Sequence, residues 1–159
     1  MSSGTFWTIL LIVHSLLALL LIGAITHQAV ALWWPVRRPA GSFIARARAV
    51  PGTSYVTAII VLYICTFIMG SWVYTQYRFT SRTALELGQW YKTVGVFEMK
   101  EHIATMGLIL LPAYWYFWRR PLSDAYAAAR KNVTLLLAII TWANFLIGHI
   151  TNNARGMGT

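Results

Sequence analysis

Three of the four histidines in this 159-residue chain have the residue type and setting to hold a metal or a haem. His14, His102 and His149 each lie within or at the edge of a long apolar run, and His27 lies in the same run as His14. Neutral imidazole is an axial ligand of b-type haem and also binds copper, zinc and non-haem iron. Ionisable side chains are costly inside a membrane, so their presence there points to chemistry or to specific pairing.

The elements that carry these histidines are apolar runs long enough to cross a bilayer, which takes about 20 helical residues. Hydrophobic residues make up 58% of the chain and charged residues only 11%, far from the composition of a soluble domain. We therefore predict an all-α protein, an integral membrane four-helix bundle that forms one domain over residues 1–159. Its expected spans are about 6–34, 54–75, 101–118 and 133–150, with an outer interfacial segment at 78–100.

The basic residues predict the orientation of this bundle. They gather in the first and third connections, while in the middle connection they alternate with Glu86, Glu98 and Glu101. Because cytoplasmic loops carry the excess of Lys and Arg, both termini and the 78–100 segment are expected on the outer, periplasmic side of a bacterial inner membrane. The net charge of +9 thus indicates loops beside anionic lipid and no nucleic-acid partner.

The expected depths place the three histidines in one layer near the outer face. Counted from the cytoplasmic end of each span, His14, His102 and His149 lie roughly 28, 24 and 25 Å up. His27 follows His14 by 13 positions, which turns it roughly 140° away on a straight helix. We therefore predict a site from the outer three histidines, without His27.

The residues leave several chemistries open for this layer. Two histidines facing each other across apolar walls would bind one haem b, whereas three would bind copper, zinc or non-haem iron, with Glu98 as a fourth ligand. Glu98 and Glu101 would handle protons, bind a quinol head group, or simply pair with nearby cations. The histidines could also only hydrogen-bond between helices. Cys65 stands alone, and we expect Met69 and Met106 to be packing residues.

Three blocks of sequence carry a resemblance. They are H-S-L-L-A-L-L-L-I-G-A-I-T-H in the first span, E-H-I-A-T-M-G in the third and G-H-I-T-N-N in the fourth. Four apolar helices with histidines near their ends resemble the compact membrane-embedded b-type cytochromes. This resemblance, which covers architecture and histidine layout only, implies haem b held by His14 and one of His102 or His149.

The function expected from the sequence is electron transfer between the quinone pool and an outer-face redox partner, as a quinol-linked oxidoreductase or a subunit of a larger membrane complex. His14, His102 and His149 would bind the cofactor, and Glu98 and Glu101 would act on protons. The alternatives are a non-haem metal protein and a cofactor-free structural subunit.

Overall fold

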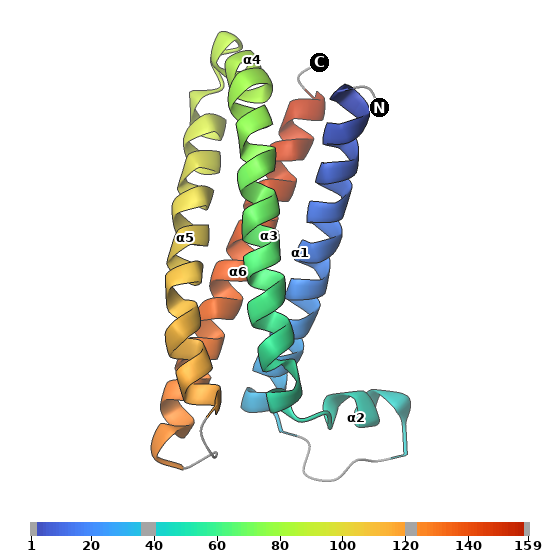
Figure 1. Cartoon of the computed structure of the whole chain (residues 1–159), viewed down its shortest axis with the longest axis vertical. Helices are drawn as coiled ribbons and strands as arrows, with labels where there is room; N and C mark the ends of the chain where they lie inside the picture. The colour runs from blue at the N-terminus through green and yellow to red at the C-terminus, as the bar shows by residue number, and fades with distance from the viewer. Residues whose placement is uncertain (1–2, 36–40, 120–123, 158–159) are drawn as a thin grey trace.

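The computed structural model describes residues 3–35, 41–119 and 124–157, and these residues are helical apart from short turns, with no strand among them. Four long helices lie side by side, and the two ends of the chain lie at the same end of the molecule (Figure 1). The α-helices are α1 (Ser3–Trp33), α2 (Phe43–Arg48), α3 (Val56–Gln76), α4 (Arg82–Leu87), α5 (Tyr91–Arg119) and α6 (Ala127–Met157). Single turns η1 (Gly52–Tyr55), η2 (Tyr77–Ser81) and η3 (Asp124–Tyr126) complete the described chain.

Three of the four long helices are long and apolar enough to cross a membrane, at Gly4–Trp33, Gly52–Leu87 and Asp124–Thr151. Large apolar side chains on these helices, such as Leu20 and Ile139, are more than half exposed. Contiguous apolar surface of this extent is foreign to soluble monomers and typical of helices that face lipid. The prediction of an all-helical protein is thereby confirmed for the described residues, and three of its helices have the length and composition of membrane spans.

The fourth long helix, α5, differs in composition. Its first third carries Lys92, Glu98, Lys100 and Glu101, whereas the part after His102 is uncharged until Arg119. The helix continues through Pro112. α5 packs mainly against α6 and also contacts α3, while α1 packs against α3 and α6. α1 and α5 are therefore diagonal, as an up-and-down order of the helices predicts.

The closely packed core occupies the half of the bundle farther from the termini. A hydrogen bond of 2.7 Å joins the Tyr114 hydroxyl group to Gln28 Oε1, and Gln28 Nε2 donates to the Gly52 carbonyl group at 2.8 Å. Trp118 Nε1 donates to Thr134 Oγ1 at 3.0 Å. Around these bonds lie buried apolar side chains from all four long helices: Leu21, Ile25, Ile59, Tyr63, Leu111, Val133, Leu137 and Ala138.

The Tyr63 side chain of α3 closes this core toward the termini. Its hydroxyl group donates to the Ala104 carbonyl group of α5 at 2.9 Å, which brings the ring over Gly107. A Cβ atom at Gly107 would overlap the Tyr63 hydroxyl group and lie 2.9 Å from Ile140 Cγ2. Glycine is thus required at position 107 so that α3, α5 and α6 can approach.

We expect Gly107→Ala to lower the free energy of unfolding by about 1–3 kcal/mol, because the added methyl group overpacks this contact. Gly95→Ala on the same helix is the matched control, since a Cβ there meets nothing within 4 Å. Thermal unfolding of the detergent-solubilised protein measures both. A Gly107→Ala variant as stable as Gly95→Ala would contradict the packing described for Tyr63.

Candidate functional site

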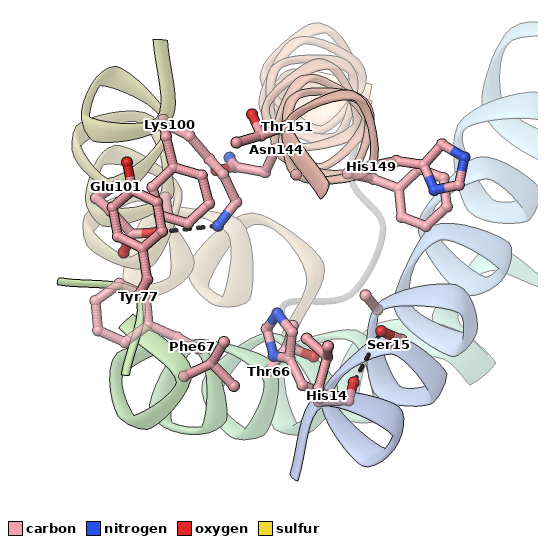
Figure 2. A pocket seen from close by; sticks show the side chains of 18 of the residues that line it. His14, Ser15, Thr66, Phe67, Tyr77, Lys100, Glu101, Asn144, His149 and Thr151 are labelled. Atoms are coloured by element: carbon pink, nitrogen blue, oxygen red, sulfur yellow. Dashed lines mark hydrogen bonds and ion pairs between the residues drawn. The ribbon is translucent and has the colours of Figure 1, made fainter. Parts of the chain in front are cut away.

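A cavity of about 450 Å³ lies between the four long helices in the half nearer the termini. All four helices contribute to its wall, and Tyr63 and Ala104 lie at the border with the closed core. The wall is largely apolar, with Trp7, Phe67 and Phe145 among its side chains. The polar side chains that Figure 2 labels around it come from all four helices.

His14 reaches this cavity from α1. Its ring lies against Gly70 of α3, where a Cβ atom would be only 3.1 Å from His14 Cε1. The Thr66 backbone lies beside the ring, but the buried Nδ1 atom has no hydrogen-bond partner among the described residues. His14 therefore offers an unused ring nitrogen inside the bundle (Figure 2).

An ion pair from α5 lies opposite His14. Lys100 Nζ is 2.9 Å from Glu101 Oε1, and the two side chains are only 15% and 27% exposed. The Lys100 ammonium group also lies 4.8 Å from the centroid of the Phe97 ring, and its alkyl chain crosses close to Gly148 of α6. Lys100, Glu101 and His14 all line the cavity. Glu101 therefore lies at the cavity wall, and its role with protons stays a prediction.

Glu98 has a different position. Its carboxylate lies 2.6 Å from Arg82 NH1, and Arg82 Nε is 2.8 Å from Glu86. This network joins α4 to α5 and is not part of the cavity wall. Of the roles predicted for Glu98, the one that fits its position is therefore pairing with a nearby cation.

Unpaired polar atoms concentrate at the cavity. Four buried side-chain atoms without a hydrogen-bond partner among the described residues belong to residues that line it: His14 Nδ1, Thr66 Oγ1, Tyr77 Oη and Asn144 Oδ1. Tyr77 begins η2, a π-helical turn that also brings Ser81 to the wall. π-Helical turns inside helices often mark functional sites. The cavity can therefore form several hydrogen bonds with a bound molecule.

Sequence reasoning missed three of these residues, Thr66, Tyr77 and Lys100. Lys100 carried a usable signal, because a Lys-Glu pair directly before an apolar run places two charges at the edge of a span. Thr66 and Tyr77 carried none, because threonine and tyrosine are common in membrane helices and at their ends.

The other two predicted ligands do not face His14. His102 is exposed on α5, with its Nδ1 atom 2.9 Å from the Glu98 carbonyl oxygen of its own helix. His149 borders the cavity, but its exposed ring stacks on Phe145 and points away from His14 (Figure 2). The structure therefore does not assemble the three histidines. Among residues 3–35, 41–119 and 124–157, no group of three His, Cys, Asp or Glu side chains is close enough to hold a metal ion.

His27 lies on another face of α1, as its 13-residue offset from His14 predicted. Its ring packs against the Tyr55 ring with the centroids 4.7 Å apart and the planes tilted by 35°, and it lines a groove beside Trp142. The haem b site stays a prediction from the sequence. With the helices as described, His102 would face His14 only after a rotation of α5 about its axis.

Comparisons with protein-family models, with curated proteins and with solved structures find no match to this chain. The chemistry of the cavity combines an imidazole, a carboxylate, an ammonium group and several hydroxyl and amide groups inside an apolar bundle. Such a site can bind a small apolar molecule with a polar head group and exchange protons with it.

Lys100→Met should lower the free energy of unfolding by about 1.5–3 kcal/mol, because it leaves the Glu101 charge without its partner inside the bundle. The double variant Lys100→Met/Glu101→Gln should recover most of this loss. Glu86→Gln is the matched control at a more exposed ion pair, with an expected loss of about 0–1 kcal/mol. Equal losses in Lys100→Met and Glu86→Gln would contradict the assignment of the Lys100–Glu101 pair to the cavity.

Proposed function

We propose that this chain is a four-span membrane protein that binds a quinone in the cavity between its helices and acts as a quinone-linked subunit of an electron-transfer complex. Three helices have the length and composition of membrane spans. α5 is of similar length and contacts two of them. The placement of its charged residues toward the cavity and the α4 network supports α5 as the fourth span, because lipid does not then have to accommodate those charges.

The observation that carries the quinone proposal is the set of four unpaired polar atoms around one cavity in an otherwise apolar bundle. A quinone is an apolar ring with carbonyl oxygens that accept hydrogen bonds, and its reduced form has hydroxyl groups that donate them. The Tyr77 hydroxyl group and Lys100 Nζ are donors for the carbonyl oxygens. Asn144 Oδ1 and the Glu101 carboxylate are acceptors for the hydroxyl groups, because Asn144 Nδ2 already donates to the Ile140 carbonyl oxygen.

The same residues supply the proton chemistry of a quinol. Oxidation of a quinol releases two electrons and two protons, and His14 and Glu101 are groups that can take up the protons as they form. The electrons would pass to a redox centre of a partner protein on the outer face. In this proposal the chain supplies the quinone site, and a bis-histidine haem is not required.

A short-chain ubiquinone analogue should bind the purified protein and quench its tryptophan fluorescence, because Trp7 lines the cavity. His14→Ala, Glu101→Gln and Asn144→Leu should each raise the Kd about tenfold, the effect of losing about 1.4 kcal/mol of hydrogen bonding. His27→Ala is the matched control, since it removes a histidine of the same helix outside the cavity.

Quinone binding that none of the three cavity variants weakens would overturn the proposal. A dithionite-reduced minus air-oxidised spectrum of the same preparation tests the haem prediction separately. If the protein shows a haem b signal and His14→Ala loses it, the cavity holds a haem and the quinone proposal is wrong.

The proposed topology has the termini and the α4–α5 turn on the outer side and α2 in the cytoplasm. In a Cys65→Ser background, cysteines at Gly4 and Leu87 should react with an impermeant maleimide added to intact cells. A cysteine at Ala49 should react only after the membrane is opened. All three positions are exposed. Labelling of Ala49→Cys in intact cells would show that the orientation is the opposite of the one proposed. Labelling of Gly4→Cys and Leu87→Cys from opposite sides of the membrane would exclude four spans.

A further inference from the structure

The outward face of α5 carries a second group of potential ligands that the cavity does not use. Met99, His102 and Met106 follow one another at spacings of three and four residues, which places them on one face of the helix. Met99 is 51% and Met106 62% exposed, and His102 is also exposed. Met106, which we expected to be a packing residue, is thus turned away from the core.

The protonation of His102 follows from its one hydrogen bond. Nδ1 lies 2.9 Å from the Glu98 carbonyl oxygen, which can only accept. Nδ1 therefore carries the hydrogen, and the lone pair that can bind a metal lies on Nε2. A backbone carbonyl group that fixes the tautomer and orientation of a ligating histidine is the usual support of a protein metal site.

Side-chain direction in the helix turns the Met106 thioether toward His102 and the His102 imidazole toward the turn that carries Met99. Long side chains of an α-helix point toward its N-terminus and cover the preceding turn. The thioether of Met106 is thus directed to the turn of His102, and Met99 lies one turn before His102 at a spacing of three residues. Neighbouring side chains at these spacings start about 5–6 Å apart at Cβ, a span that a metal ion between them can bridge.

The donor types select the metal. Two thioethers and one imidazole form a soft set, which favours Cu(I) over hard ions such as Mg²⁺ or Ca²⁺. The nearest acidic residues in the sequence are engaged elsewhere, Glu98 with Arg82 and Glu101 with Lys100. We propose that Met99, His102 and Met106 bind one Cu(I) ion on the outward face of α5, the face turned away from the bundle. This site is independent of the quinone proposal, because none of its three residues lines the cavity.

Anaerobic titration of the reduced, purified protein with Cu(I) against a chromophoric Cu(I) chelator tests the proposal. The Cys65→Ser background removes the one thiol of the chain. One equivalent of Cu(I) should bind, and X-ray absorption should show both sulfur and nitrogen ligands. Met99→Leu, Met106→Leu and His102→Ala should each weaken binding at least tenfold, as expected when one of three ligands is lost.

Met69→Leu and His27→Ala are the matched controls, since they remove the same residue types from other parts of the bundle. The ligand positions are exposed, so their variants should keep the unfolding temperature of the parent without metal. Binding that is unchanged in the three ligand variants would overturn the proposal. Loss of Cu(I) binding in His14→Ala, with binding unchanged in the α5 variants, would also overturn the proposal, since it would place the copper in the cavity.

Discussion

Polar groups inside a bundle that faces lipid must find partners within the protein, because the surrounding hydrocarbon supplies none. In the half of the bundle away from the termini, the central polar side chains are paired, whereas His27 Nε2 in the groove beside Trp142 has no hydrogen-bond partner among the described residues. Gln28 is bonded to both Tyr114 and Gly52, and Trp118 to Thr134. The half near the termini leaves polar atoms of four side chains facing a cavity instead. This contrast separates the part of the bundle that provides stability from the part suited to bind a ligand.

Two glycines set the geometry of the cavity because a Cβ atom has no room at either position. Gly107 admits the Tyr63 side chain, whose hydroxyl group bonds α5 and separates the cavity from the closed core. Gly70 lets the His14 ring lie against α3. A β-carbon at Gly107 or Gly70 would force its neighbour to move. The positions of the imidazole and of the cavity floor thus depend on residues that have no chemistry of their own.

The charged residues of α5 have two separate roles that follow from their helical positions. Lys100 and Glu101 lie at the cavity wall, and Glu98 lies on the side toward α4, where Arg82 neutralises it. His102 and its two methionine neighbours lie on the outward face. One helix therefore presents an ion pair, a surface network and a group of exposed methionine and histidine side chains in different directions, since successive residues are turned by about 100°.

The sequence by itself determined the helical class, three of the four expected apolar spans and the level of each histidine along its helix, because length, hydropathy and rise per residue set those quantities. It also identified His14 and Glu101, which the structure places at one cavity. Only the tertiary structure decided that His102 faces outward, that His149 turns away and that Lys100, Thr66 and Tyr77 join the site. The physical reason lies in the composition of the helices. α1 is apolar all round, so no polar face marks its outside, and lipid is as apolar as a protein core. The rotation of each helix is set by contacts such as Tyr63 with Gly107, which depend on pairs of residues far apart in the sequence.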